Sequence, residues 1–329
     1  MKTNAFLRYW AIAVIWLAVG MSAIAGNGAP VRVGIAWQPS TSNYHRAILA
    51  IRAAGGEPVL LDQMRPAGFE YDDMELSPEY FDEMGVLHQE YADIVKCDTY
   101  HGTPIAEQLQ EVQAVVFLGG GDISPTLFSV PQPWHGIPDD SPANATRDVS
   151  EYLTMAYCLD HDIPVLGLCR GMQMLGVVSG APLIQDLEKY FDEMGIIYHF
   201  LHREQRDAEG KRHYTPHDVI VVDRNSLLYS ISQSDTIHNV PSWHHQVVDD
   251  VEGTPLRITG VTPTDGTTII EAIERTDKAF ALGVQYHPEE AVRKHIETDS
   301  DEARFMPIDE AVAYFRALIQ AAKGATNVD

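Results

Sequence analysis

The chain has 329 residues, 45% of them hydrophobic, so it can bury a sizeable core as one large domain or two smaller ones. With 23 Lys and Arg residues against 47 Asp and Glu residues, its formal net charge is −24. A surface of this charge repels nucleic acids and anionic membranes, which excludes nucleic-acid binding and identifies no other partner.

The first 25 residues are typical of a signal peptide. Lys2 and Arg8 precede an apolar run at residues 10–19, and Ala23-Ile24-Ala25 matches the A-x-A pattern of a signal-peptidase site. We expect cleavage after Ala25, export to the periplasm or the medium, and no stable membrane association afterwards. The alternative is an uncleaved anchor, but the apolar run is short for a bilayer-spanning helix of about 20 residues.

Short apolar runs along the first half predict buried strands. They are rich in β-branched residues, are bounded by Gly or Pro, and lie at residues 31–37, 58–61, 114–118 and 164–168. Helix-compatible segments separate them, which predicts an α/β fold with a mostly parallel central sheet and helices on both faces. Beyond residue 215 further strands are expected to extend the sheet, and residues 308–323 form a final amphipathic helix. We treat residues 26–329 as a single domain.

Residues 64–102 fit this plan less well. They are polar, acidic and aromatic, and they separate two predicted strands by more residues than a compact α/β unit usually needs. We interpret them as a partly helical insertion that forms a cap and shapes the binding pocket.

Cys97, Cys158 and Cys169 are the cysteines of the chain, an odd and sparse set that does not read as a disulfide framework. Cys169 lies in the sequence GLCRG between an apolar run and a helix-like run, which is the sulfur version of G-x-S-x-G. Such a turn exposes the thiol at a helix N-terminus, whose partial positive charge favours the thiolate. A structural cysteine before a helix would give the same pattern, so a base must also be found.

The segment GVQYHPEE supplies a base. His287 follows the apolar run that ends at Tyr286, and Glu289 lies two residues further on. Both side chains would leave the carboxyl end of a strand, where sites in open α/β sheets form. A surface turn is the alternative for an isolated His-Pro-Glu, but together with Cys169 these residues make a plausible triad.

The segment FLGGGDISP supplies candidate oxyanion donors. Glycines after a strand let backbone N–H groups approach a ligand, and we assign the donors to Gly120, Gly121 and the N–H of Arg170. The competing hypothesis is a phosphate loop. No G-x-x-x-x-G-K-[ST] occurs, and Asp122 directly after the glycines would repel phosphate.

Several histidines lie close together in the sequence. His199 and His202 form an H-x-x-H pair, with His213 and His217 nearby, and such clusters can bind zinc. No cysteine or closely spaced carboxylate completes a ligand set, so we expect no metal. We interpret the segment as a loop over the mouth of the active site.

In combination, the motifs GGGDISP, Arg147-Asp148, GLCRGMQMLGV, QDL, WHHQVV and GVQYHPEE resemble the class I glutamine amidotransferase superfamily. Within it, the chain is similar to the γ-glutamyl-γ-aminobutyrate hydrolase family from residue 31 to about residue 322. The resemblance implies a flavodoxin-like sandwich. It also implies that Cys169 is the acylated nucleophile, His287 the general base and acid, and Glu289 the carboxylate that orients the imidazole.

The resemblance further assigns the substrate pocket. Gln173 matches the position that contacts the glutamyl group, and His245 and Gln246 match the segment that lines the pocket for its α-amino and α-carboxylate groups. The implied reaction is cleavage of a γ-glutamyl amide through a glutamyl thioester, without metal or organic cofactor. The partner is then a small γ-glutamyl molecule, and a homodimer is an arrangement that the resemblance allows.

Two other functions stay open. One is a glutaminase subunit that delivers ammonia to a synthase, and the other is an inactive γ-glutamyl-binding protein. The export signal disfavours the first, because a synthase and its ATP would be cytoplasmic, and the intact Cys, His and Glu set disfavours the second. The leaving group, whether an amine, a peptide or a folate polyglutamate, is not specified by the sequence.

Overall fold

The computed structural model describes residues 29–39, 42–98, 100, 103–136, 142–298 and 304–325. The predicted signal peptide, residues 1–25, lies outside these residues. Among the helices in the described ranges, none is both long enough and apolar enough to cross a membrane.

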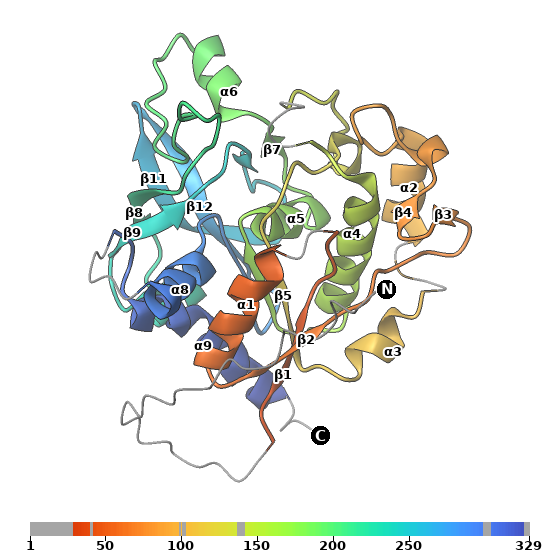
Figure 1. Cartoon of the computed structure of the whole chain (residues 1–329), viewed down its shortest axis with the longest axis horizontal. Coiled ribbons are helices and arrows are strands. Elements are labelled where there is room, and N and C mark those ends of the chain that lie inside the picture. Colours follow the sequence, from red (N-terminus) through yellow and green to blue (C-terminus); the bar gives the residue numbers. More distant parts are fainter. Residues whose placement is uncertain are drawn as a thin grey trace, which may run out of the picture.

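A nine-stranded mixed sheet runs through the centre of the molecule (Figure 1), in the order β2-β1-β5-β6-β13-β12-β11-β8-β9. The strands from β2 to β13 are parallel, and those from β12 to β9 are antiparallel to their neighbours. The strand bounds are β1 Arg32–Ile35, β2 Glu57–Leu60, β5 Ala114–Phe117, β6 Val165–Leu168, β8 Thr215–Val221, β9 Thr236–Ser242, β11 Leu256–Thr264, β12 Thr267–Arg275 and β13 Ala281–Val284. The predicted α/β class is confirmed, and the four apolar runs of the first half contain β1, β2, β5 and β6.

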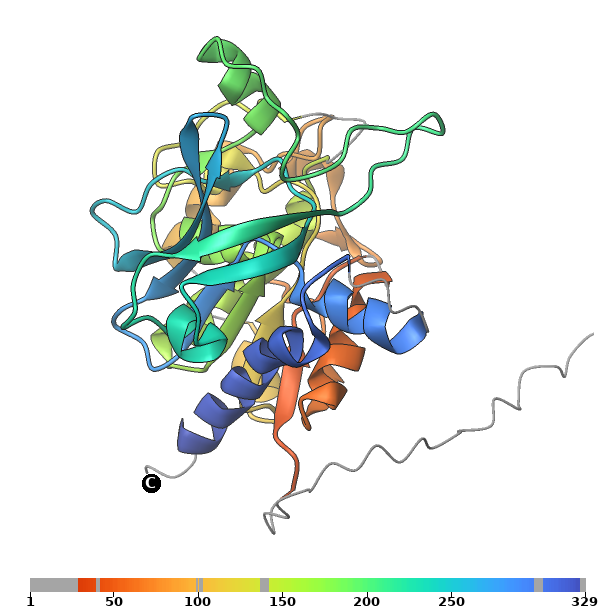
Figure 2. The same cartoon turned by 90° about the vertical axis from the view of Figure 1, so that its left-hand side faces the viewer.

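Helices cover both faces of the sheet. One face carries α4 (Ala145–Asp160) and α5 (Arg170–Val178), and the other carries α1 (Ser42–Ala53), α8 (Pro288–Glu297) and α9 (Ile308–Ala325), which lie together in Figure 2. Strand β5 shows why its sequence is apolar throughout: Val115 and Phe117 pack into one core and Ala114 and Val116 into the other. Successive side chains of a strand point to opposite faces, so a doubly covered strand needs apolar residues at every position.

The insertion packs against α4. It contains β3 (Tyr71–Asp72), β4 (Glu75–Leu76), the 3-10 helix η1 (Pro78–Tyr80) and α2 (Gln89–Asp98), so the prediction of a partly helical segment is confirmed. The backbone N–H groups of Met64 and Leu76 donate to the hydroxyls of Ser150 (2.9 Å) and Thr146 (3.0 Å) on α4. These bonds hold the insertion beside the sheet.

The remaining elements are short. They are α3 (Ile105–Leu109), η2 (Pro125–Leu127), α6 (Leu187–Glu193), α7 (Leu227–Ser232), and a two-stranded sheet of β7 (Leu183–Ile184) and β10 (Val247–Val248). Helix α6 and the segment after it stand beyond the end of the main sheet in Figure 1.

Strand β6 turns directly into helix α5 at Cys169, whose φ of 52° lies in the left-handed region. Glycines on both sides make the turn possible. A Cβ at Gly167 would lie 2.5 Å from the carbonyl oxygen of Gly171, and one at Gly171 would overlap the carbonyl oxygen of Phe117 on β5. The strand-to-helix turn predicted from GLCRG is therefore present, and its tightness depends on these two missing side chains.

We expect Gly171→Ala to destabilise the protein by about 1–3 kcal/mol, because the added methyl group meets a backbone atom of a central strand that cannot move aside. The matched control is Gly324→Ala in α9, where the new methyl group has no neighbour within 4 Å and alanine favours the helix. Urea unfolding of both variants is the measurement. A Gly171→Ala protein as stable as the wild type would contradict the close approach of α5 to β5.

Candidate active site

The three residues of the predicted triad lie together. Cys169 is at the N-terminus of α5, His287 caps the N-terminus of α8 directly after β13, and Glu289 is in the first turn of α8. His287 Nδ1 donates a hydrogen bond to Glu289 Oε1 (2.6 Å), and His287 lines the same cavity as Cys169. Because Leu168 of β6 pairs with Val284 of β13, the ends of these neighbouring strands place the thiol beside the imidazole.

The surroundings of His287 change the pKa of its imidazole. Burial lowers this pKa, but Tyr214, Glu289 and Cys169 raise it, and it lies well above its ordinary value. An imidazolium beside Cys169 favours the thiolate, which is the nucleophilic form of cysteine.

A cavity of about 670 Å³ opens beside these residues. Its lining combines Cys169 and His287 with the glycine loop after β5 and with the cations Arg46 and Arg212. The complete lining is Gln38, Pro39, Asn43, Arg46, Gly119, Gly120, Gly121, Asp122, Pro142, Ala143, Asn144, Arg147, Cys169, Arg170, Arg212, Tyr214, Trp243 and His287. The cavity is therefore large enough for a small ligand and reaches the thiol.

The predicted oxyanion donors face this cavity. Gly120 and Gly121 line it, and Arg170 is the first residue of α5, where helix N–H groups have no intrahelical acceptor. In the described part of the chain, the N–H groups of Gly120 and Gly121 make no hydrogen bond. Gly120 leaves no room for a side chain, because a Cβ there would overlap the Arg147 guanidinium.

A buried ion-pair network holds the glycine loop in place. Arg147 of α4 donates from Nη2 to the carbonyl oxygens of Leu118 and Gly119, at 3.0 Å each, and from Nε to Glu151 Oε1 at 2.8 Å. In the sequence, Arg147-Asp148 is recognisable only as a motif, without an indicated role. The structure shows that Arg147 holds the glycine loop in place through two backbone oxygens.

The same network reaches the nucleophile turn. Arg170, the residue after Cys169, forms ion pairs with Asp148 and Glu151, and Asp148 Oδ2 accepts from the N–H of Ser124 (2.9 Å). All of these charged side chains are buried. Sequence reasoning assigned Arg170 only for its backbone N–H and missed its side chain, because an acid on α4 is distant in sequence.

His245 lies between two carboxylates. Its Nε2 donates to Asp122 Oδ1 (2.8 Å) and its Nδ1 donates to Asp186 Oδ2 (2.9 Å). Burial lowers the pKa of His245, but the two aspartates raise it to about 9, so the ring is an imidazolium at neutral pH. Both nitrogens are thus occupied. His245 lines a small cavity with Cys169, as expected, but it has no free nitrogen for a glutamyl group.

Gln173 and Gln246 lie in the lining of the same small cavity. Gln173 Nε2 donates to the backbone oxygen of Gln246 (2.7 Å), and Gln246 Oε1 accepts from the N–H of Ile123 (3.4 Å). The structure therefore brings both predicted residues to the nucleophile. Their amides also join the glycine loop to the segment that follows β9.

Comparisons with known proteins agree with this geometry. The family model of Peptidase C26 matches residues 94–289, a range that contains Cys169, His287 and Glu289. The chain belongs to the Peptidase C26 family. The matched range also includes the glycine loop that lines the cavity around the thiol.

Two known proteins are similar to this chain in sequence, and one solved structure is similar to it in fold. Protein NtpR of Enterococcus hirae is 31% identical over 60% of this chain and 74% of its own length. The γ-glutamyl-γ-aminobutyrate hydrolase PuuD of Escherichia coli K12 is 30% identical over 46% of this chain and 56% of its own length. A crystal structure of a proposed GMP synthase protein from Thermoplasma acidophilum has a TM-score of 0.50 at 13% identity, with 92% of this chain and 98% of that chain covered, and shows the fold alone.

Two segments were expected to lie beside the cavity: the insertion and the histidine-rich segment. The cavity lining includes none of the described residues of the insertion, so the role of residues 64–102 in shaping the pocket stays a prediction. The histidine-rich segment does contribute, through Arg212 and Tyr214, although its exposed His199 and His213 pair with Asp265 and Asp207.

We expect the charge on His245 to make stability depend on pH. Its folded pKa of about 9 is above the unfolded value of about 6.5, so its contribution is complete below pH 6.5 and is lost as pH rises to 9. The free energy of unfolding should fall over this window by up to ~3 kcal/mol. Urea unfolding between pH 6 and 10 is the measurement. His245→Gln should flatten the decrease, the exposed His238→Gln should not, and equal pH profiles for wild type and His245→Gln would contradict the assignment.

Proposed function

We propose that this Peptidase C26 protein is a cysteine hydrolase that cleaves the γ-glutamyl amide bond of γ-glutamylated amines or peptides. The observation that carries the proposal is the meeting of Cys169, His287 and Glu289 at a cavity beside unused N–H groups of the glycine loop. The name of the relative PuuD supports the γ-glutamyl substrate class, although the match spans only 56% of that protein.

The mechanism follows from the positions of these groups. The Cys169 thiolate attacks the γ-carbonyl carbon, a C–S bond forms, and the carbonyl electrons move onto oxygen, where the N–H groups of Gly120, Gly121 and Arg170 stabilise the charge. When the intermediate collapses, the C–N bond breaks and His287 transfers its proton to the departing amine. Glu289 keeps the imidazole oriented throughout.

The second step returns the enzyme to its starting state. The neutral His287 removes a proton from water, and the hydroxide oxygen attacks the carbonyl carbon of the glutamyl thioester. The C–S bond breaks, glutamate leaves, and Cys169 thiolate and His287 imidazolium are restored. Water is the only co-reactant.

The leaving-group side of the site is cationic. A second cavity of about 470 Å³ shares Arg46, Arg212 and Tyr214 with the first. It is also lined by Arg293, Lys294 and Arg304, and by Glu290, which forms ion pairs with Arg46 and Arg293. The cationic side chains outnumber this carboxylate, and an excess of positive charge attracts anionic ligands. We therefore propose that the departing amine carries a carboxylate, as γ-aminobutyrate, amino acids and glutamyl chains do.

Two other functions make different predictions. A glutaminase subunit would release ammonia from glutamine and need a synthase, and an inactive binding protein would form no thioester. We also propose that the mature protein starts after Ala25 and acts outside the cytoplasm.

Purified mature protein should release amine and glutamate from at least one of γ-glutamyl-γ-aminobutyrate, a γ-glutamyl dipeptide or folate polyglutamate. Cys169→Ala should lower the rate at least ~10³-fold, because no other group in the site can form the thioester. Cys158→Ala, which removes a buried thiol outside the cavity, is the matched control. Release from glutamine alone would favour the glutaminase alternative.

Intact-mass spectrometry of the same protein completes this test. A glutamyl adduct that requires Cys169 supports the hydrolase, and its absence with every substrate favours the binding protein. The same spectrum reads the N-terminus, and a mass that still includes residues 1–25 after export would contradict cleavage after Ala25.

We expect Arg212→Gln to discriminate between two substrates that differ in one group. For γ-glutamyl-γ-aminobutyrate, kcat/KM should fall about 10-fold or more, since a cation near a carboxylate is lost. For γ-glutamyl-butylamine, which lacks that carboxylate, kcat/KM should change little. Equal losses for both substrates would show that Arg212 has a structural role only.

A further inference from the structure

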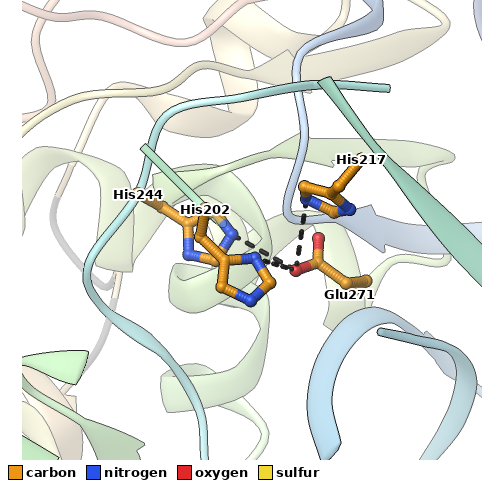
Figure 3. A group of neighbouring side chains, drawn as sticks. All are labelled: His202, His217, His244 and Glu271. Carbon is orange, nitrogen blue, oxygen red and sulfur yellow. Dashed lines mark ion pairs between the residues drawn. The ribbon is translucent and has the colours of Figure 1, made fainter. Parts of the chain in front are cut away.

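A second buried cluster lies apart from the triad. His202 precedes β8, His217 is on β8, His244 follows β9, and Glu271 is on β12, and their side chains converge in Figure 3. Each offers one ligand atom, and these atoms lie within 4.8 Å of one another. His202 and Glu271 are 0% exposed, His244 is 2% and His217 is 5%. The cluster is therefore closed to solvent on all sides.

The distances to the carboxylate match those of metal ligands. Glu271 Oε1 is 3.0 Å from His202 Nδ1, 3.3 Å from His244 Nε2 and 3.7 Å from His217 Nε2. Tetrahedral ligands at about 2.0–2.1 Å from a zinc ion are separated from one another by about 3.4 Å. Small rotations of the imidazoles would close the remaining differences.

These close approaches lack the geometry of hydrogen bonds. The facing atoms of all three rings, and both oxygens of Glu271, lack a hydrogen-bond partner in the described structure. Buried polar groups are normally satisfied, and each one left unpaired costs about 1–3 kcal/mol. Such a concentration of unpaired atoms in one place indicates a missing positive partner.

The hydrogen bond at Nδ1 of His217 shows which of the two ring nitrogens carries the proton. His217 Nδ1 faces the backbone oxygen of Asp218 (3.2 Å), which only accepts, so the ring proton is on Nδ1. In the neutral ring, Nε2 then points a lone pair at Glu271.

His202 gives the same result. Its Nε2 faces the hydroxyl of Thr264 (2.9 Å), which donates its own proton to the backbone oxygen of Thr262, so Nε2 carries the ring proton. In the neutral ring, Nδ1 then points a lone pair at Glu271. Two lone pairs therefore meet a carboxylate oxygen, an arrangement that repels unless a cation lies between them.

We propose that His202, His217, His244 and Glu271 bind one divalent transition-metal ion, with zinc the ion that their ligand types and tetrahedral spacing fit. Four protein ligands leave no open position, which is the arrangement of a structural site. The H-x-x-H pattern led us to expect no metal, because the carboxylate that completes the set is far away in sequence. His199 and His213, which that pattern included, do not belong to the site.

The site would fix the segment between β9 and β10. His244 stands between Trp243, whose backbone oxygen is 3.9 Å from Cys169 Sγ, and His245, which pairs with Asp122 and Asp186. A metal bound at His244 would tie this segment to β8 and β12. It would thereby hold one wall of the small cavity beside the nucleophile without touching a substrate.

The test is the metal content of the wild-type chain, purified without a histidine tag and dialysed without chelator. Mass spectrometry of the elements should find about one divalent transition-metal ion per chain. X-ray absorption at the edge of that metal should show nitrogen and oxygen at about 2.0–2.1 Å, whereas sulfur at about 2.3 Å would place the ion on a cysteine instead and overturn the proposal.

Variants and refolding locate the ion. Glu271→Gln and His217→Gln should bind less than about a tenth of an ion per chain, and His199→Gln, outside the cluster, should keep about one. Because the buried variants could fail to fold, wild-type protein is also refolded from urea with EDTA and then given Zn²⁺ alone. The melting temperature should drop by several degrees in EDTA and recover with Zn²⁺.

Metal-free wild-type protein with an unchanged melting temperature in EDTA and in Zn²⁺ would overturn the proposal and leave the cluster as a proton-sharing network. Equal metal loss from His199→Gln and His217→Gln would also overturn it. These readouts do not use hydrolytic activity, so failure here is distinguishable from failure of the proposed function.

Discussion

The buried ion pairs among Arg147, Glu151, Arg170 and Asp148 are the interaction on which the rest of the site depends. Arg147 holds the glycine loop through two backbone oxygens, and Arg170 is the residue next to the nucleophile. Removing one partner of a buried pair costs about 3–5 kcal/mol because the other charge is left without compensation. The positions of thiol and oxyanion donors are therefore fixed together, by groups that cannot be lost singly.

The glycine loop is clamped at both ends. At its start, Arg147 holds the carbonyl oxygen of Gly119, and at its end the carboxylate of Asp122 is bound by the His245 imidazolium. Glycines give the loop close access to Arg147 and His287 but no side chains of their own for packing. Charged partners from outside the loop supply the rigidity that an oxyanion hole requires.

Local patterns predicted the fold and the elements that carry Cys169, His287 and Glu289, because apolar runs, glycines at a tight turn and a His-Pro-Glu turn carry their meaning within a few residues. Partnerships between distant segments were not predictable in this way. The carboxylates of Asp122, Asp186 and Glu151 looked like ordinary acids, since their partners lie on other elements. Glu271 likewise joins His202 only because β12 passes the segment before β8. The packing of the insertion on α4 was not predictable either, because its length reveals nothing about the direction in which it folds.

The pairing of β6 with β13 has an evolutionary consequence. Cys169 follows β6 and His287 comes soon after β13, and Leu168 and Val284 are in register. Their separation is therefore governed by the spacing of adjacent strands, about 4.8 Å, rather than by any loop length. Segments elsewhere can change in length while the distance between these two side chains stays constant. The periphery of the chain can thus vary without renewed selection for the spacing of Cys169 and His287.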